Sequence, residues 1–349
     1  MSKVFITGAT GQVGSSVADY LIKKKPLGIE KPADILCLTR NPEKALCLKK
    51  RGTEVVKGTL SDREILFNAV RNVAYVFHLA AEVFVYSSYE KMYKTNVEGT
   101  KNLLDAFVNS SASIFVYTSS IIVYNEKLAK SSNFEFTENA ELGPCTPGSD
   151  VPYAVTKRLA EKLVNEYAFK HQTKTFIITR LSPIVGPGDR QMIPALVKSL
   201  KSPIPKLVNG GRGSIHLTAP EDVARAQVFL AERLRGPERK IFNVANEVVS
   251  FKTLFEVISD YYNCSPPRVS IPLWLFKCVK PFLLFVKKFF PNNLFIQTFF
   301  SPSALQYIEK TYCYSSEKLK KLGFEYEFPI RDTILKALKE FDPDRKLVN

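Results

Sequence analysis

Short apolar runs alternate with longer amphipathic stretches along the first half of the chain. The short runs are rich in β-branched and aromatic residues and predict strands at Val4–Thr7, Asp34–Thr39, Glu54–Lys57, Ala74–His78, Ser113–Thr118 and Thr175–Thr179. The longer stretches predict helices near residues 12–24, 61–71, 89–109 and 152–170. Parallel strands joined by helical crossovers form a sheet that is covered on both faces. The pattern therefore predicts a doubly wound α/β fold.

The pattern changes after about residue 181, where prolines at positions 183, 187, 194, 203 and 205 break the chain into short pieces. Helices are predicted again near residues 220–234 and 251–262. We therefore divide the chain into a domain of residues 1–180 and a smaller C-terminal α/β region of residues 181–349, to which we assign substrate binding. Residues 125–150 contain glycines and prolines without periodicity and predict a long loop, a kind of segment that is usually functional.

The charge and the cysteines exclude several classes of partner. Lysine and arginine outnumber aspartate and glutamate by 49 to 34, and the net charge of +15 favours nucleic acid, anionic lipid or an anionic cofactor. No zinc-finger spacing, helix-turn-helix pattern or aromatic RNA-binding signature is present, so we expect no sequence-specific nucleic-acid binding. The six cysteines lack C-x-x-C spacing and only three histidines accompany them, so we expect no metal site. A strand begins directly after the first residues, which leaves no room for a signal peptide and predicts a cytoplasmic protein.

A glycine-rich turn, Thr7-Gly-Ala-Thr-Gly-Gln-Val-Gly14, joins the first predicted strand to the first helix. Gly8 and Gly11 allow the backbone to turn tightly and to approach a pyrophosphate, and Gly14 allows the helix to pack closely against the strand. The N-terminus of the helix offers unpaired N–H groups to the phosphates. This arrangement predicts a dinucleotide-binding Rossmann domain.

Residues after the second and third predicted strands bear on which dinucleotide is bound. The acidic residue that would bind the ribose of NAD is missing after the second strand, and Arg40 stands there instead. Arginine suits the 2′-phosphate of NADP, so we favour NADP over NAD, with a solvated loop position as the alternative for Arg40. Asp62 is a candidate partner for the adenine amine and equally a candidate N-cap of the following helix.

Tyr153 and Lys157 lie one helical turn apart at the start of a predicted helix, downstream of a strand that ends in Ser119-Ser120. The same Tyr-x-x-x-Lys spacing begins at Tyr20 and at Tyr314, but only Tyr153 has this context. A free tyrosine, with a pKa of about 10, is a poor base at neutral pH. We expect the ammonium of Lys157 to lower the pKa of Tyr153 and to hold the nicotinamide ribose, while a serine hydroxyl hydrogen-bonds the substrate oxygen. These roles predict hydride transfer between a substrate carbon and a nicotinamide.

Further motifs accompany these two patterns. They are His78-Leu-Ala-Ala81, Asn96-Val-Glu-Gly-Thr100, Ser119-Ser-Ile-Ile-Val-Tyr124 and the stretch from Arg180 to Gly188. With the glycine turn and the Tyr-Lys pair, they resemble an extended short-chain dehydrogenase/reductase over essentially the whole chain. The resemblance implies Ser120, Tyr153 and Lys157 as catalytic residues, with Ser119 as a supporting neighbour and a partly structural role for Asn96. The complete predicted cofactor set is Gly8, Thr10, Gly11, Gln12, Val13, Gly14, Arg40, Asp62, Leu79, Ala80, Ala81, Asn96, Tyr153, Lys157 and Pro183.

Two positions in the second half of the chain concern the substrate. Nucleotide-sugar epimerases and dehydratases of this superfamily usually carry an asparagine where this chain has Ser182, and an arginine where it has Ile215. Both departures disfavour a nucleotide sugar. The stretch Arg180–Asp189, followed by Ile193-Pro-Ala-Leu, resembles instead the 3β-hydroxysteroid dehydrogenase and dihydroflavonol reductase branch, whose substrates are apolar alcohols and ketones.

Residues 271–300 combine aromatic and aliphatic side chains with Lys277, Lys280, Lys287 and Lys288. At about 100° per residue the four lysines fall in one stripe opposite the aromatic residues, which predicts a basic amphipathic helix. Prolines and amides in the uncharged run of residues 289–308 disfavour a membrane-spanning helix. Three roles remain open: a lid over an apolar substrate, a peripheral contact with an anionic membrane, and a domain or homodimer face.

The leading hypothesis is an NADP-dependent dehydrogenase or reductase acting on a secondary alcohol or ketone of an apolar, sterol-like or isoprenoid-like molecule. The alternative enzyme is a nucleotide-sugar epimerase or dehydratase that retains its nicotinamide. A hypothesis from another class is a binding module that senses the dinucleotide without turning over a substrate. The intact set of serine, tyrosine and lysine disfavours that module.

Overall fold

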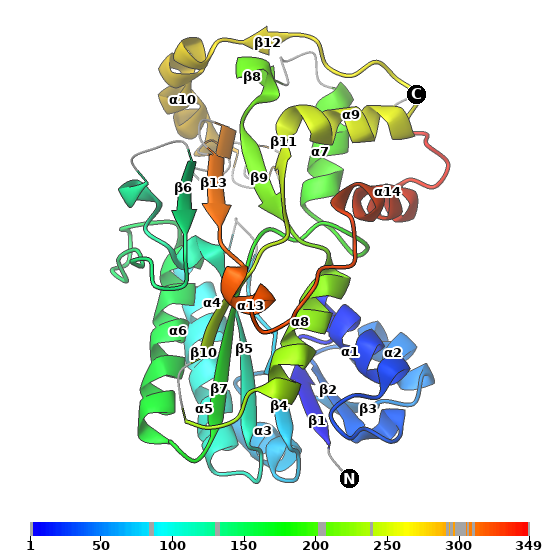
Figure 1. The fold of residues 1–349 in the computed structure, drawn as a ribbon, viewed down its shortest axis with the longest axis vertical. Helices are drawn as coiled ribbons and strands as arrows, with labels where there is room; N and C mark the ends of the chain where they lie inside the picture. Colours follow the sequence, from blue (N-terminus) through cyan, green and yellow to red (C-terminus); the bar gives the residue numbers. More distant parts are fainter. Residues whose placement is uncertain are drawn as a thin grey trace.

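The computed structural model describes residues 3–83, 87–129, 133–201, 207–237, 240–290 and 311–347, together with residues 293, 296, 305 and 307–308. Its centre is a seven-stranded sheet with the strand order β10-β7-β5-β4-β1-β2-β3, in which all pairings are parallel (Figure 1). The order changes direction between β1 and β4, and ligands of such sheets bind at the carboxyl edge beside that point. The predicted doubly wound α/β fold is confirmed.

The strands of the central sheet are β1 Val4–Thr7, β2 Ile35–Thr39, β3 Glu54–Lys57, β4 Tyr75–His78, β5 Ile114–Ser120, β7 Thr175–Leu181 and β10 Lys240–Val244. The shorter strands outside it are β6 Asn133–Phe136, β8 Leu207–Val208, β9 Ser214–Leu217, β11 Glu247–Ser250, β12 Ser270–Ile271 and β13 Thr311–Tyr314. The helices are α1 Gln12–Lys24, α2 Leu46–Lys50, α3 Arg63–Val70, α4 Tyr89–Tyr93, α5 Gly99–Val108, α6 Pro152–Lys170, α7 Met192–Lys201, α8 Pro220–Arg233, α9 Phe251–Tyr261, α10 Leu273–Lys287, α13 Glu317–Lys320 and α14 Ile330–Phe341. Among the described residues, no helix is both long enough and apolar enough to span a bilayer.

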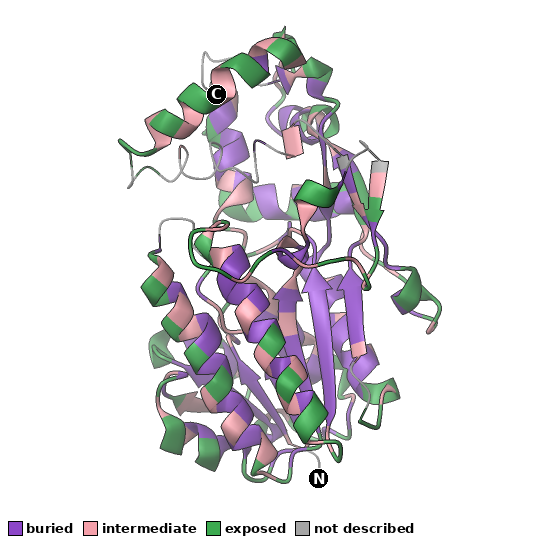
Figure 2. Cartoon of the chain, turned by 90° about the vertical axis from the view of Figure 1, so that its left-hand side faces the viewer, coloured by how far each residue is buried: buried purple, intermediate pink, exposed green. Residues whose placement is uncertain are grey.

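Alternate side chains of the central strands enter two different cores. Val4 and Ile6 of β1 pack with Leu21 of α1 and Val228 of α8 on one face. Phe5, between them, packs with residues of α3, α5 and α6 on the other face. Helices cover both faces, so the central strands are largely buried (Figure 2). By contrast, β3 at the sheet edge is partly exposed.

Parts of the C-terminal region return to the central sheet. Helix α8 packs against α1, and β10 adds the outermost strand beside β7, although both follow residue 180. Helix α13 also packs against β10, and its Leu319 joins the core of the central sheet. Helices α7, α9 and α14 form a second body beyond the carboxyl edge of the sheet, with a separate core between them (Figure 1). The two parts predicted from the sequence are therefore interleaved along the chain.

Two predicted segments differ from the structure. Residues 125–150, predicted as loop throughout, contain β6, which pairs with β13 because Phe136 packs between Tyr124 and Tyr314 in a small aromatic core. The helix predicted at 89–109 is divided by a π-helical turn, Lys94–Glu98, between α4 and α5. Such turns are frequent at functional sites, and this one contains Asn96.

Candidate active site

The glycine turn between β1 and α1 has the shape that binding of a pyrophosphate requires. Gly8 has φ of +76°, and a Cβ there would lie 2.7 Å from the backbone nitrogen of Ala80. A Cβ on Gly14 would lie 2.1 Å from the carbonyl oxygen of Gly8, so these two positions accept only glycine. Gly11 precedes α1 without a side-chain cap and with no acidic residue in the first helical turn. The free N–H groups of that turn can therefore receive phosphate oxygens.

A chain of hydrogen bonds supports the turn from below. The Thr7 hydroxyl lies 2.7 Å from Nδ1 of His78, and Nε2 of His78 lies 2.9 Å from the hydroxyl of Thr100. The Thr100 hydroxyl donates its own proton to the carbonyl of Asn96, so it must accept a hydrogen bond from the Nε2–H group of His78. Nδ1 of His78 then carries no proton and accepts a hydrogen bond from the Thr7 hydroxyl. Burial and the charge of Lys157 lower the pKa of His78 to about 3. His78 is therefore neutral, and it connects β1 rigidly to β4 and α5.

Other predicted cofactor positions lie along the same sheet edge. The backbone of Leu79 and Ala80 follows β4 directly beside Gly8, and both N–H groups donate to Thr7. The Gln12 side chain donates to the carbonyl of Gly186, so the start of α1 faces the loop that contains Pro183. Positions in this region that are partly exposed, and so open to a ligand, are Thr10, Gln12, Val13, Leu79, Ala80, Ala81 and Pro183. These open positions along one sheet edge, beside the free N–H groups at the start of α1, fit a dinucleotide.

Arg40 and Asp62 lie further along the edge, after β2 and β3. Arg40 is exposed just beyond the end of β2, which pairs directly with β1. Asp62 precedes α3, but its carboxylate does not cap that helix; it accepts hydrogen bonds from the backbone and hydroxyl of Thr59. Asp62 is thus the N-cap residue of α3 by position, as considered, but its carboxylate turns back and stabilises the loop after β3 instead of bonding to the helix.

Ser120, Tyr153 and Lys157 meet at the carboxyl end of β5. The hydroxyl of Tyr153, in the first turn of α6, is hydrogen-bonded to Ser120, the last residue of β5. The ammonium of Lys157 lies 6.0 Å from the centre of the Tyr153 ring and donates to the carbonyl of Thr118 at 2.7 Å. Lys157 is buried, whereas Ser120 and Tyr153 remain partly exposed, so the two hydroxyls are the groups that a substrate can reach.

The pKa shifts at this site differ from the sequence-based expectation. Burial raises the pKa of Tyr153 above its ordinary value, although the hydrogen bond with Ser120 opposes the shift. Lys157 does not lower it here, because its ammonium points at the Thr118 carbonyl rather than at the phenol. Burial also lowers the pKa of Lys157 to about 8, against the opposing charge of Glu161. Lys157 is thus still mainly cationic at neutral pH.

Asn96 connects the segment after β4 to helix α6, which contains Tyr153 and Lys157. Its amide accepts from the backbone N–H of Glu82 and donates both to the Glu82 carbonyl and to the hydroxyl of Thr156. Thr156 lies next to Lys157 on α6. With its amide occupied in this way, Asn96 holds the segment after β4 against α6, in agreement with the structural part of its expected role.

An ion pair that the sequence reasoning did not single out lies directly behind Lys157. Glu161, one turn further along α6, forms a salt bridge with Arg180 of β7 at 2.5 Å, and both side chains are almost completely buried. The Glu161 carboxylate also accepts from Ser119 at 2.7 Å, next to Ser120. The spacing of Lys157 and Glu161, four residues apart on one predicted helix, could have indicated this partner.

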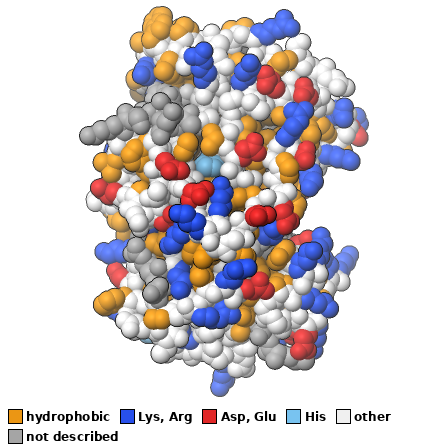
Figure 3. All heavy atoms as spheres, in the orientation of Figure 1, with side chains coloured by type: hydrophobic (Ala, Val, Ile, Leu, Met, Phe, Trp, Pro, Cys, Tyr) orange, Lys and Arg blue, Asp and Glu red, His pale blue; other side chains and the backbone are white. Residues whose placement is uncertain are grey.

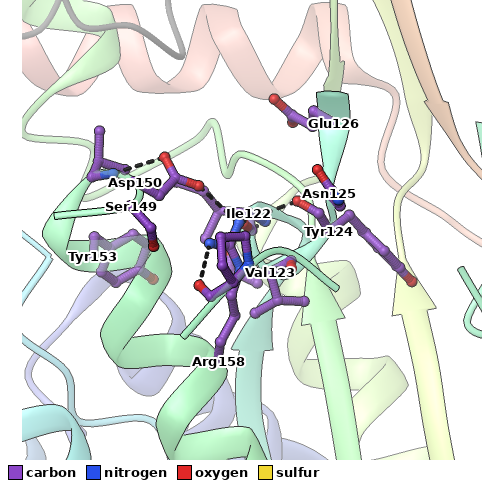
Figure 4. Close-up of polar contacts among 12 residues, drawn as sticks. Ile122, Val123, Tyr124, Asn125, Glu126, Ser149, Asp150, Tyr153 and Arg158 are labelled. Carbon is purple, nitrogen blue, oxygen red and sulfur yellow. Dashed lines mark hydrogen bonds and ion pairs between the residues drawn. The ribbon is translucent and has the colours of Figure 1, made fainter. Parts of the chain in front are cut away.

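Arg158 was also missed, and it organises the loop of residues 125–150. Its guanidinium donates to the carbonyls of Ile122, Val123, Tyr124 and Pro144 and to the carboxylate of Asp150. Figure 4 shows it beside Tyr153, pointing away from the phenol toward the strand end and the loop. A lone arginine inside a helix gives no sequence signal for this role, because its five acceptors come from distant segments.

A shallow depression on the surface is formed by Arg63, Glu64, Phe67 and Asn68, all within α3. None of the predicted catalytic residues contributes to it. The depression is therefore separate from the candidate site at the carboxyl edge of the sheet.

A parallel sheet with a glycine turn after β1 and a serine, tyrosine and lysine set after β5 defines a dinucleotide-dependent enzyme of the Rossmann class. Residues 4–245 match the model of the NAD dependent epimerase/dehydratase family, and the chain belongs to this family, within the extended short-chain dehydrogenases/reductases. Its members are NAD-dependent dehydrogenases, epimerases or dehydratases. The enzyme class and the resemblance found in the sequence are thereby confirmed.

Individual relatives within this family differ in substrate. The chain is 27% identical over 299 residues to a bovine sterol-4-alpha-carboxylate 3-dehydrogenase (decarboxylating), covering 83% of this chain and 82% of the relative. It is 28% identical over 263 residues to a dTDP-D-glucose 4,6-dehydratase of Dictyostelium discoideum, covering 71% and 59%. A solved UDP-glucuronic acid 4-epimerase from Bacillus cereus in complex with NAD shares the fold at a TM-score of 0.73 and 16% identity, covering 97% and 96%.

Proposed function

We propose that this protein transfers hydride between NADP and a secondary alcohol or ketone of an apolar, sterol-like or isoprenoid-like substrate. The proposal of an apolar substrate rests on the side chains of Ser182 and Ile215. Ser182 is buried and its hydroxyl pairs with Thr218 at 2.8 Å, and Ile215 is an aliphatic residue of β9. Neither position offers a donor to a nucleotide diphosphate.

The roles of the catalytic residues follow from their positions. A bound nicotinamide supplies the hydride acceptor or donor. During oxidation Tyr153 accepts the proton of the substrate hydroxyl, and during reduction it returns a proton to the carbonyl oxygen. Ser120 donates a hydrogen bond to the same substrate oxygen as its charge changes. The buried ammonium of Lys157, which donates to the Thr118 carbonyl at the end of β5, offers its remaining donors to the ribose hydroxyls.

The preference for NADP rests on Arg40. Its position at the end of β2, beside the glycine turn, is the one from which a side chain meets the adenosine ribose, and an exposed guanidinium suits a 2′-phosphate. The Arg40→Asp variant should bind NADPH roughly tenfold more weakly or worse, with NADH affinity unchanged or improved. Arg71→Asp, at an exposed arginine beyond the end of α3, is the matched control. Equal losses for the two cofactors would contradict the preference.

The second candidate is a nucleotide-sugar epimerase or dehydratase, which the dehydratase relative at 28% identity supports. The two candidates differ in what the purified protein does. A dehydrogenase releases and exchanges its dinucleotide, while an epimerase keeps it through the oxidation and the re-reduction of the same carbon.

One parallel experiment tests the proposal. Purified enzyme is incubated with a panel of sterol and isoprenoid alcohols and ketones, and separately with uridine and thymidine diphosphate sugars, each with NADP(H) and NAD(H). We expect net change in nicotinamide absorbance only with the apolar panel and more rapidly with NADP(H). Turnover of a nucleotide sugar without net cofactor change would establish the second candidate. Dinucleotide binding without turnover in either panel would establish the binding module.

A further inference from the structure

The outward face of α10 is aromatic. Trp274, Phe282 and Phe285 are 67%, 62% and 53% exposed, and Phe289 just beyond the helix is 64% exposed. Phe276 is the one buried residue of this helix. In Figure 3 the hydrophobic side chains gather at the upper left, where Figure 1 places α10. A surface of this kind on a water-soluble fold marks an interaction site.

The exposed aromatic residues lie on one side of α10, opposite the side that is buried against the protein. At 3.6 residues per turn, Trp274, Phe285, Phe289 and Phe282 fall within a stripe about 80° wide if the turn continues past Lys287. Phe276, the buried residue of α10, lies on the opposite side of the helix. A lid over an apolar substrate would turn its aromatic residues inward. The observed orientation therefore disfavours the lid role for the described part of residues 271–300.

Two lysines flank the aromatic stripe. Lys277 and Lys288 are both exposed and project about 40° to 60° from the stripe on one side. Lys287, by contrast, is partly buried and lies further round the helix, and burial lowers its pKa. From residue 261 to residue 308 the sequence contains no aspartate or glutamate, so this segment itself contributes only positive charge.

These charges decide between the occupants of the face. In a symmetric dimer built on α10, the same patch would meet itself and bring Lys277 and Lys288 of both copies into one interface. Like charges at a desolvated interface are repulsive. An anionic lipid surface offers the complement of both features, because aromatic side chains enter the acyl boundary while lysines remain among the headgroups.

We propose that α10 docks on the surface of an anionic lipid bilayer, with Trp274, Phe282 and Phe285 in the bilayer interface and Lys277 and Lys288 against the headgroups. The helix then lies parallel to the membrane. This contact does not depend on the proposed catalytic function, because lipid binding is measured without substrate or cofactor.

The sequence provides a built-in reporter, since Trp274 is the single tryptophan of the chain. The full-length protein is mixed with vesicles of phosphatidylcholine alone or with added phosphatidylglycerol. We expect a blue shift of the tryptophan emission, protection from acrylamide quenching and co-sedimentation with the anionic vesicles only, weakened by salt. The absence of a shift with anionic vesicles, or an equal shift with neutral ones, would overturn the proposal.

Paired variants locate the contact. Phe282→Ser/Phe285→Ser and Lys277→Glu/Lys288→Glu should each weaken vesicle affinity at least about tenfold. The controls are Phe169→Ser, at a 77% exposed phenylalanine of α6, and Lys49→Glu/Lys50→Glu on α2, with the same change in charge. Controls that lose as much affinity as the α10 variants would refute docking through this helix. Concentration-dependent dimers that these α10 variants abolish, without vesicle binding, would assign the face to a second copy instead.

Discussion

The carboxylate of Glu161 and the guanidinium of Arg180 form a buried ion pair between α6 and β7, directly behind the candidate catalytic residues Tyr153 and Lys157. The pair also holds two further parts of the site. Glu161 accepts from Ser119, and Arg180 donates to the hydroxyl of Tyr124, which in turn donates to Asn243 of β10. One network thus connects β5, α6, β7 and β10 at the carboxyl edge of the sheet.

Replacing Glu161 by glutamine should affect stability strongly. The change leaves Arg180 buried without its counter-ion, which typically costs about 3–5 kcal/mol of the free energy of unfolding. We expect Glu161→Gln/Arg180→Gln to be less destabilised than the sum of its two single variants, as measured by urea denaturation. Additive losses would show that the two side chains are not energetically coupled.

The same glutamate should set the pH range of dinucleotide binding. The Lys157 ammonium has a pKa of about 8, lowered by burial and raised by Glu161. Its charge is present below that pH and lost above it, so cofactor affinity should fall as pH rises through about 8. In Glu161→Gln this fall should begin at lower pH, because the supporting negative charge is gone. Fluorescence titration with NADPH measures the shift, and an unchanged midpoint would leave Glu161 with a purely structural role.

Tyr153→Phe should abolish catalysis and leave cofactor binding nearly unchanged. In the proposed reaction the phenol is the proton donor and acceptor, and loss of such a group lowers kcat by roughly 100-fold to 10,000-fold. Its ring, which contacts Lys157, is kept, so the dissociation constant for NADPH should change little. Tyr20→Phe is a matched control, because Tyr20 and Lys24 repeat the spacing on α1 away from the site. Full activity of Tyr153→Phe would refute the assigned proton transfer.

Arg158→Lys should loosen the loop of residues 125–150. A lysine cannot reproduce the five hydrogen bonds that the guanidinium makes to four carbonyls and Asp150, and each buried group left without a partner costs about 1–3 kcal/mol. We expect faster limited proteolysis within the loop and a higher KM for substrate. Lys162→Arg, at an exposed position of the same helix, should show neither effect. Equal proteolysis of both variants would show that Arg158 does not hold the loop.

The local parts of this molecule were predictable, and the long-range ones were not. Alternating patterns identified the first six strands of the sheet and the glycine turn, because each depends on side chains close in sequence. The strand β10 was missed: it is a short apolar run isolated from the other sheet strands, and only its pairing with β7 reveals its place. Likewise, β6 could not be predicted, because it is stabilised by the packing of Phe136 against Tyr314, a residue distant in sequence.

The candidate site divides in the same way. Ser120, Tyr153 and Lys157 could be found from spacing and from the family resemblance. The direction in which Lys157 points, and hence its missing influence on the pKa of Tyr153, depends on the Thr118 carbonyl beneath it. Arg158 and Arg180 acquire their roles only through partners that folding brings together.

Acid should destabilise the protein through two buried histidines. Burial, with a neighbouring lysine charge as a lesser cause, lowers the pKa of His78 to about 3 and that of His216 to about 4, below their ordinary value near 6.5. Below pH 6.5 these two histidines bind protons in the unfolded chain but remain neutral in the folded protein. The free energy of unfolding should therefore decrease as the pH is lowered, by up to about 1.4 kcal/mol per pH unit for each histidine. Denaturation at pH 7 and pH 5.5 measures the slope, and His216→Gln should reduce it while His171→Gln, at a partly exposed position, should not.

Gly11 and Gly14 should respond differently to alanine, although both belong to the same turn. A Cβ at Gly14 would overlap the Gly8 carbonyl at 2.1 Å, whereas one at Gly11 would stand 3.2 Å from it. Gly14→Ala should therefore cost about 1–3 kcal/mol or more of folding free energy and abolish dinucleotide binding. Gly11→Ala should fold nearly as well as the parent and still bind NADPH poorly, because its methyl group occupies the approach of the pyrophosphate. Thermal unfolding and NADPH titration separate the two effects, and a Gly11→Ala variant with normal NADPH affinity would mean that the phosphates do not approach this part of the turn.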